Sequence, residues 1–267
     1  MIVAQNSKPP YHGLLHDRQM NLYMKKNAWI LVAIGFTAAI AALQLNRQKA
    51  PADIVCHTAG STAPGMAVLV IGESWAAGGR LLPGMAETVR QRLGRGSVKV
   101  CTIGYSGRNA SQLLDAVHED LTQQRISELL GDHQLKNIVI LAGVNDVVQH
   151  VGKASYVAGV QGMVDYWPGL KVEAVEIPRV IETGVPSGLA SQAKRFVQRH
   201  VFDDGKHEVI ETYRAALAQT NISTISYDPF IPSYLGNEGA YAPDGIHLTL
   251  EMYQSYGKYL GSRIKLD

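Results

Sequence analysis

Short apolar runs that recur from residue 66 onward constrain the fold of this 267-residue chain more than any other feature. The run 66–71 is continuously apolar, as expected of a strand buried on both faces, and further strands are expected at 98–103, 137–141 and 171–177. Segments of helical character lie between and after them, at 83–93, 111–130, 156–167, 207–218 and 248–264, and a short fifth strand is expected at 222–225. This alternation predicts an α/β fold, with a parallel sheet between two layers of helices.

A separate apolar segment lies near the N-terminus. Residues 28–45 (AWILVAIGFTAAIAALQL) carry no charge. As a helix they would be about 27 Å long, close to the thickness of the hydrocarbon core of a bilayer. Residues 1–27 contain four basic residues and one acidic residue. This excess of positive charge keeps residues 1–27 in the cytoplasm and directs the chain after the apolar run across the membrane. We therefore expect a cytoplasmic segment at 1–27 and a transmembrane anchor or signal sequence at 28–45.

The export segment allows two interpretations. The long lead favours an uncleaved anchor, whereas translation from Met24 would give the form of a signal peptide with a small-residue cleavage site at 39–41. Both interpretations place the remainder outside the cytoplasm, either anchored to the membrane or secreted or periplasmic. Residues 46–65 are rich in Pro, Ala, Gly, Ser and Thr and are expected to form a linker, which leaves 66–267 as the folded domain.

Composition excludes several classes of protein and site. A hydrophobic content of 46% argues against disorder, and a net charge of +2 gives no reason to expect nucleic acid as a partner. The nine histidines lack metal-ligand spacing and two cysteines are too few for a four-cysteine zinc site, so we expect no metal and no cofactor. Cys56 and Cys101 would form a disulfide after export or remain as two buried thiols, and the sequence leaves both possibilities open.

Candidate catalytic residues follow the strands of the predicted sheet. Ser74 follows the first strand, Gly107 the second and Asn145 the third, while the pair Asp244 and His247 precedes the last helix. Because ligands bind at the carboxyl ends of parallel strands, these groups are expected to meet at one edge of the sheet. Each residue alone is more typical of a cap, a turn or a surface position. Together they provide the nucleophile, base, acid and donors that acyl transfer needs.

Four sequence blocks in this order, IGESW, SGRNA, GVND and DGIHL, resemble the SGNH (GDSL-type) hydrolase family over nearly the whole exported domain. The resemblance implies a three-layer α/β/α fold with a parallel, flavodoxin-like sheet, which is the SGNH hydrolase fold. It also implies that Ser74 is the nucleophile, His247 its base and Asp244 the partner of His247. The oxyanion hole would consist of the backbone N–H groups of Ser74 and Gly107 and the side-chain amide of Asn145.

Two residues depart from the family pattern. Glu73 replaces the usual Asp before the nucleophile, and Trp75 replaces the usual Leu after it. We expect Glu73 to alter the local hydrogen bonding and Trp75 to line the substrate pocket. Arg108 is a further candidate for substrate contact, although a solvated arginine is more common.

The expected activity is that of an extracytoplasmic serine esterase acting on small-molecule or glycan esters, with O-acetyl groups on a carbohydrate as the favoured substrate. An uncleaved segment at 28–45 would add contact with a membrane. The alternatives are a lysophospholipase or other lipid esterase, a glycan O-acetyltransferase, and a non-catalytic glycan-binding domain of the same fold.

Overall fold

The predicted parallel sheet is present, and it organises the whole of the described chain. The computed structural model describes residues 52–179 and 210–266, apart from the single positions 62, 95, 122, 232, 233 and 235. The predicted segments 1–27 and 28–45 lie outside these residues. Within them, no helix combines the length and the apolar character that crossing a membrane requires.

Six strands form one sheet in the described chain: β1 Asp53–Ala59, β2 Met66–Gly72, β3 Val98–Gly104, β4 Gln134–Leu141, β5 Lys171–Val175 and β6 Thr224–Ile225. Their spatial order is β1-β3-β2-β4-β5-β6. All neighbouring pairs are parallel except β1 and β3. Without β1, the order is the flavodoxin-like one, in which the chain reverses direction across the sheet beside the first parallel strand, here β2.

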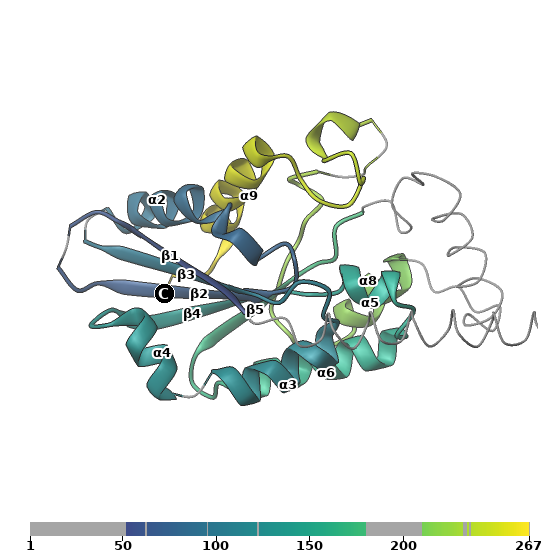
Figure 1. Cartoon of the computed structure of the whole chain (residues 1–267), viewed down its shortest axis with the longest axis horizontal. Coiled ribbons are helices and arrows are strands. Elements are labelled where there is room, and N and C mark those ends of the chain that lie inside the picture. The colour runs from purple at the N-terminus through teal and green to yellow at the C-terminus, as the bar shows by residue number, and fades with distance from the viewer. Residues whose placement is uncertain are drawn as a thin grey trace, which may run out of the picture. The chain divides into compact units, whose positions relative to one another are not determined.

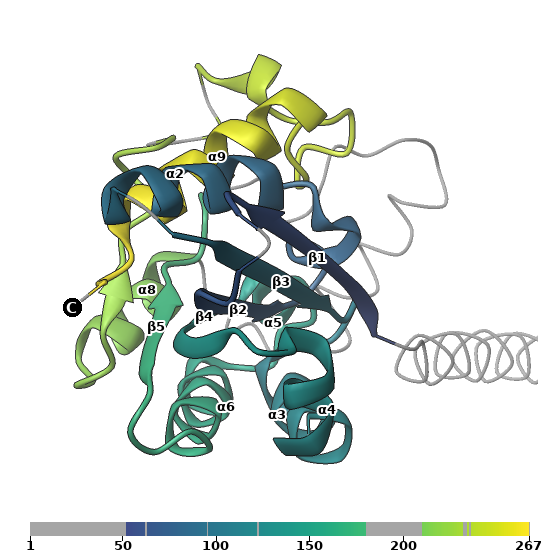
Figure 2. The same ribbon diagram turned by 90° about the vertical axis from the view of Figure 1, so that its left-hand side faces the viewer.

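Helices cover both faces of this sheet (Figures 1 and 2). Helices α2 (Leu82–Leu93) and α9 (Leu250–Arg263) pack side by side on one face. The other face carries α3 (Ala110–Asp120), α4 (Gln123–Leu130) and α6 (Lys153–Asp165), with α8 (Ile210–Ala218) beside α6. Three short elements lie in the connections: η1 (Ala77–Gly79), α5 (Val144–Val148) and η3 (Glu238–Ala240). The α/β/α prediction is therefore confirmed.

Strand β1 corrects the predicted domain boundary. The expected linker at 46–65 contains this strand, which pairs antiparallel with β3 so that Asp53 lies opposite Gly104. Only one neighbour covers β1, and His57 and Thr58 remain exposed on it. An edge strand of this kind needs no continuous apolar run, which is why its composition resembled that of a linker. The folded unit accordingly spans Ala50–Asp267.

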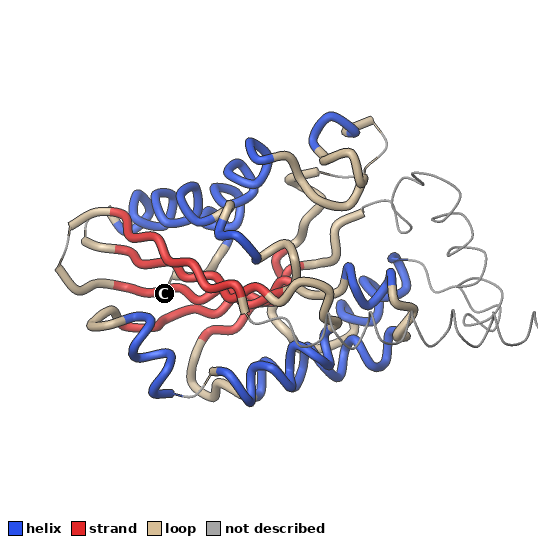
Figure 3. The backbone as a smooth tube through the Cα atoms, viewed as in Figure 1, coloured by secondary structure: helices blue, strands red, loops and turns tan. Residues whose placement is uncertain are grey.

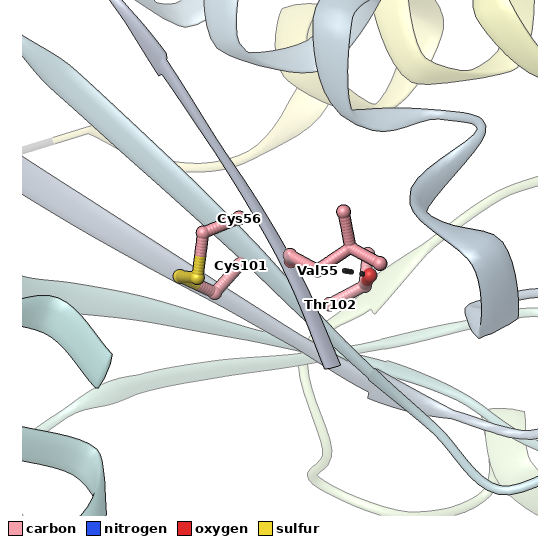
Figure 4. The surroundings of a disulfide bond; sticks show 4 residues. All are labelled: Val55, Cys56, Cys101 and Thr102. Carbon is pink, nitrogen blue, oxygen red and sulfur yellow. Dashed lines mark hydrogen bonds between the residues drawn. A yellow bond between two sulfur atoms is a disulfide. The ribbon is translucent and has the colours of Figure 1, made fainter. Parts of the chain in front are cut away.

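A disulfide joins β1 to β3. Cys56 and Cys101 lie directly opposite each other in the two strands and are bonded through their sulfur atoms (Figure 4). Beside them, the Thr102 hydroxyl donates to the carbonyl oxygen of Val55 at 3.5 Å. Of the two possibilities that the sequence left open, the structure shows the disulfide.

Helix α9 and the turn after β2 are joined by an aromatic cluster. Trp75 has only 3% of its surface exposed. Its ring makes edge-to-face contacts with Tyr227, Tyr253 and Tyr256, at centroid distances of 6.0, 5.8 and 5.7 Å. Trp75 is thus buried among these tyrosines, and its contact with a substrate stays a prediction. A large aromatic side chain is most stable when its apolar surface is buried, and here that burial fixes the turn that carries Ser74.

We expect the disulfide to contribute to stability. In the chain-entropy model, a bond across a sequence separation of 45 residues is worth about 4 kcal/mol. Dithiothreitol should lower the urea midpoint of the wild-type chain. It should leave Cys56→Ala, which lacks the bond from the start, unchanged. A wild-type midpoint that does not respond to full reduction would contradict this expectation.

Removal of the Trp75 ring should destabilise the fold. Because the side chain is buried, Trp75→Ala is expected to lower the free energy of unfolding by about 3–5 kcal/mol. Trp75→Phe keeps most of the aromatic contacts and should lose clearly less. Urea denaturation followed by circular dichroism measures both variants, and equal midpoints for Trp75→Ala and wild type would show that the ring is not packed against the tyrosines.

Candidate active site

The nucleophile candidate lies where β2 ends. The backbone of Glu73, next to Ser74, donates to the Leu141 carbonyl of β4, so the turn begins while still bonded to the sheet. The chain then turns sharply, and the Ala76 N–H returns to the Glu73 carbonyl at 2.9 Å. This turn passes close to the end of β3, where a Cβ atom on Gly104 would collide with the backbone of Ala77. Glycine at the end of β3 thus leaves room for the Ser74 turn.

Asp244 and His247 share a tight turn ahead of α9. The Asp244 Oδ1 atom accepts from the backbone N–H groups of Ile246 and His247, both at 2.9 Å. Gly245, which lies between Asp244 and Ile246, adopts a left-handed conformation with φ of 69°. This use of an aspartate side chain to close a turn explains the three-residue spacing of the pair, because it folds the Asp244 carboxylate back toward the His247 ring.

The predicted triad residues meet in one line of hydrogen bonds. The His247 Nδ1 atom lies 2.6 Å from Asp244 Oδ2, and His247 Nε2 lies 2.7 Å from Ser74 Oγ. Partial burial would raise the pKa of Asp244, but the hydrogen bonds from the His247 ring and backbone outweigh it and lower this pKa below its usual value. An ionised Asp244 favours the His247 tautomer with its proton on Nδ1, which leaves Nε2 free to accept the Ser74 proton.

Asn145 lies in α5, in the connection that leaves the strand next to β2. It follows β4, which pairs with β2 so that Leu141 lies opposite Gly72. Its side-chain Nδ2 donates one hydrogen to the Arg108 carbonyl oxygen at 3.1 Å. An amide nitrogen carries two hydrogens, so this bond uses only one of them. Asn145 therefore links the loop after β4 to the loop after β3, as an oxyanion donor between them would require.

Gln149 is a residue at this site that the sequence analysis missed. Its Nε2 atom donates to the Gly107 carbonyl at 2.7 Å, and its Oε1 atom accepts from the Asn109 side chain at 3.1 Å. Gln149 thereby fixes the loop whose Gly107, with φ of 82°, was predicted to supply a backbone donor. The available signal was its spacing: Gln149 follows Asn145 by four residues, one turn of α5.

Two buried carboxylates lie behind the triad. Glu73 is 2% exposed and Asp146 is fully buried. Burial raises the pKa of Glu73 to about 8, with a further increase from the charge of Asp146, while hydrogen bonds from Asn145 and Val144 oppose it. Burial likewise raises the pKa of Asp146 to about 6. Both Glu73 oxygens accept hydrogen bonds from the loop of Asn145, while the expected difference from an aspartate stays a prediction.

Arg108 lies at the same edge of the sheet. Its guanidinium is 4.7 Å from the centre of the Tyr105 ring, and the residue is half-buried. Its backbone carbonyl accepts the hydrogen bond from Asn145. A substrate contact through the Arg108 side chain stays a prediction. Among the described residues, no group of three or more His, Cys, Asp or Glu side chains is arranged to hold a metal ion.

Solved structures of lipases share this fold. A lipase/acylhydrolase from Enterococcus faecalis is 16% identical with a TM-score of 0.53, over 74% of this chain and 95% of its own. A lipase from a goat rumen metagenome is 12% identical with a TM-score of 0.51, over 74% and 96% of the two chains. At such identities the likeness concerns the fold alone. No curated protein is similar enough in sequence to match this chain.

The family relationship follows from the sequence match that accompanies this fold. The model of the GDSL-like lipase/acylhydrolase family matches residues 58–255, a range that contains the Ser74, Asn145, Asp244 and His247 positions. That range covers well over half of the chain and begins inside β1. The chain belongs to the GDSL-like lipase/acylhydrolase family.

Proposed function

We propose that the protein is a serine esterase that cleaves carboxylic esters through an acyl-enzyme on Ser74. One observation carries this proposal: the continuous hydrogen-bonded line from Asp244 through His247 to Ser74, with distances of 2.6 and 2.7 Å. Membership of a lipase/acylhydrolase family supports ester hydrolysis as the reaction class. A serine hydroxyl is a weak nucleophile until a base removes its proton, and this line provides that base.

In the acylation step, Ser74 Oγ attacks the ester carbonyl carbon while its proton moves to His247 Nε2. The carbonyl oxygen becomes an oxyanion, which the Asn145 amide and the backbone N–H groups of Ser74 and Gly107 stabilise. Asp244 stabilises the imidazolium that forms on His247. The C–O bond to the alcohol then breaks, His247 returns its proton to the leaving alcohol, and the acyl group remains on Ser74.

In the deacylation step, water takes the place of the alcohol. His247 removes a proton from the water as it attacks the acyl carbon, and the same donors stabilise the second oxyanion. The bond from the acyl carbon to Ser74 Oγ breaks, and His247 Nε2 returns the proton to the serine. The products are a carboxylic acid and the free enzyme, so no cofactor is consumed.

The proposed substrate is an O-acetyl group on a carbohydrate outside the cytoplasm. The disulfide between Cys56 and Cys101 supports an oxidising compartment, and the apolar segment at 28–45 supports export or anchoring. Within the described part of the chain the triad reaches the surface, since the side chains of Asp244 and His247 are 48% and 32% exposed. An open site favours a short acyl group on a bulky glycan over a long chain that needs an apolar tunnel.

A lipid esterase is the second candidate. Strand β1 runs antiparallel to the rest of the sheet, so Asp53 lies opposite Gly104 at the edge that carries the triad. The first residue of β1 therefore lies at the catalytic edge. If residues 28–45 act as an anchor, the protein is held at a membrane, where a lipid or a membrane-attached glycan is a possible substrate. An acetyltransferase would use the same acyl-enzyme but pass the acyl group to a sugar hydroxyl.

Turnover of short esters should depend on Ser74. The full chain is expected to hydrolyse p-nitrophenyl acetate faster than the butyrate or octanoate, and to release acetate from O-acetylated polysaccharide. Ser74→Ala should abolish both reactions, while Ser111→Ala, which changes an exposed serine of α3, should leave them intact. Preference for octanoate would favour lipid substrates instead. Transfer to added glycan in excess of hydrolysis would favour an acetyltransferase.

Asn145 should act mainly in the transition state. Loss of one oxyanion donor typically costs about 10²–10³ in kcat. Asn145→Ala is therefore expected to lower kcat for p-nitrophenyl acetate by this factor with little change in KM. Steady-state kinetics beside the wild type measure both constants. An Asn145→Ala enzyme with wild-type kcat would remove this side chain from the proposed oxyanion hole.

A further inference from the structure

The proposed reaction leaves one buried carboxylate beside the nucleophile without a role. Glu73 directly precedes Ser74, and its side chain is buried with 2% of its surface exposed. Its Oε1 atom accepts from the Val144 backbone N–H, and its Oε2 atom accepts from the Asn145 backbone N–H, both at 2.8 Å. Both oxygens of Glu73 are thus used on one short turn, the one that carries the Asn145 amide.

The same turn is held from its other side. Asp146 is fully buried, and its Oδ2 atom accepts from the Ala110 backbone N–H of α3 at 2.9 Å. The Asn145 side chain itself donates to the Arg108 carbonyl. The position of Asn145 is therefore set by bonds to the loops after β2 and β3, and Glu73 supplies the bonds to the loop of the nucleophile.

A carboxylate is a costly group for this task. Burial disfavours its charged form unless hydrogen bonds compensate, and an apolar side chain could fill the same space. What an apolar side chain cannot do is accept two backbone N–H groups at once. Two parallel bonds fix the direction of a turn as well as its position, as they do in other bidentate carboxylate contacts.

We propose that Glu73 is a positioning residue for the oxyanion hole: its carboxylate fixes the backbone of Val144 and Asn145 and thereby aims the Asn145 amide at the carbonyl oxygen that Ser74 attacks. This inference rests on the proposed esterase function. Oxyanion donors accelerate a reaction because they are already placed when charge develops, and a displacement of about 1 Å can remove much of the effect. Glu73 acts through Asn145 and touches no reacting atom.

A double-mutant cycle on the full chain tests this coupling. Wild type, Glu73→Gln, Asn145→Ala and the double variant are compared on p-nitrophenyl acetate at pH 9, above the pKa of about 8 for Glu73, with the Ser74→Ala rate subtracted. Glu73→Gln should lower kcat and kcat/KM together by roughly 10- to 100-fold and leave KM within about twofold. The double variant should be no slower than Asn145→Ala alone, since Glu73 then has no donor to position.

Glu173→Gln is the matched control. Glu173 of β5 is equally buried, at 2% exposed, and its carboxylate also accepts from a backbone N–H, that of Lys265 at 3.0 Å. It lies within a strand away from the loops of the site, so its change should lower stability without lowering kcat. A similar loss of kcat in Glu173→Gln would show that any buried carboxylate has this effect and would overturn the proposal.

Glu73→Asp tests whether the carboxylate positions Asn145 or only stabilises the fold. It replaces Glu73→Gln in the test if the glutamine variant does not fold. Because aspartate keeps the charge and both acceptor oxygens, Glu73→Asp should retain more of the wild-type kcat than Glu73→Gln. If Glu73→Gln is unfolded, the kcat of Glu73→Asp is compared with that of Asn145→Ala and should be higher. If the losses of kcat in Glu73→Gln and Asn145→Ala multiply in the double variant, or if Glu73→Gln has the wild-type kcat, the positioning role of Glu73 is overturned. The proposed esterase function is not affected by either result. Absence of Ser74-dependent turnover in the wild type would overturn the proposed function and this proposal with it.

Discussion

The parallel pairing of β2 with β3 and β4 is the constraint on which the rest of the site depends. Gly72, Gly104 and Leu141 end these three strands in register, so the loops that follow them leave the sheet at one edge. The nucleophile, the predicted Gly107 donor and Asn145 come from these three loops. The backbone bonds from Glu73 to Leu141 and from Tyr105 to Gly72 extend the sheet by one residue. Beyond them the loops need other contacts to hold a geometry that catalysis requires to within a fraction of an ångström.

Side chains provide those contacts, and most of them are polar. Glu73 joins the loop after β2 to the loop after β4, and Asp146 joins the loop after β4 to α3. Gln149 bonds the loop after β3 to the end of α5. Trp75 provides the apolar counterpart by attaching the Ser74 turn to tyrosines on and near α9. Since α9 follows the turn of Asp244 and His247, this aromatic packing also holds the base near the nucleophile. The site thus depends on contacts between loops that are distant in the sequence.

Prediction from the sequence succeeded where a local pattern carries the information. Apolar-rich segments identified β2, β3, β4 and β5, and β2, which is covered on both faces, is apolar throughout. The Asp-x-x-His spacing identified the triad turn for a similar reason, since the turn is closed by its own aspartate. In both cases the residues that determine the structure lie within a few positions of one another.

Prediction failed where the decisive partner is remote. The predicted helix at 111–130 is divided into α3 and α4, because Leu121 leaves helical geometry between them and is fully buried. The sequence did not show that Trp75 is buried, because the tyrosines that cover it lie in the remote α9 region. Strand β1 could be a linker until β3 is present to pair with it. Likewise Cys56 and Cys101 could stay reduced unless their strands lie opposite each other.

The edge strand that the sequence did not reveal also supports the catalytic loop. Asp53 accepts from the Gly78 backbone N–H at 2.7 Å, and Gly79 packs closely against Val55, so η1 rests on β1 immediately after the Ser74 turn. Figure 3 shows this edge strand beside the other strands of the sheet. An exposed edge strand bonded on one side is the part of a sheet most easily lost, and the disulfide ties it to β3 covalently. The bond therefore stabilises the support of the nucleophile turn as well as the domain itself.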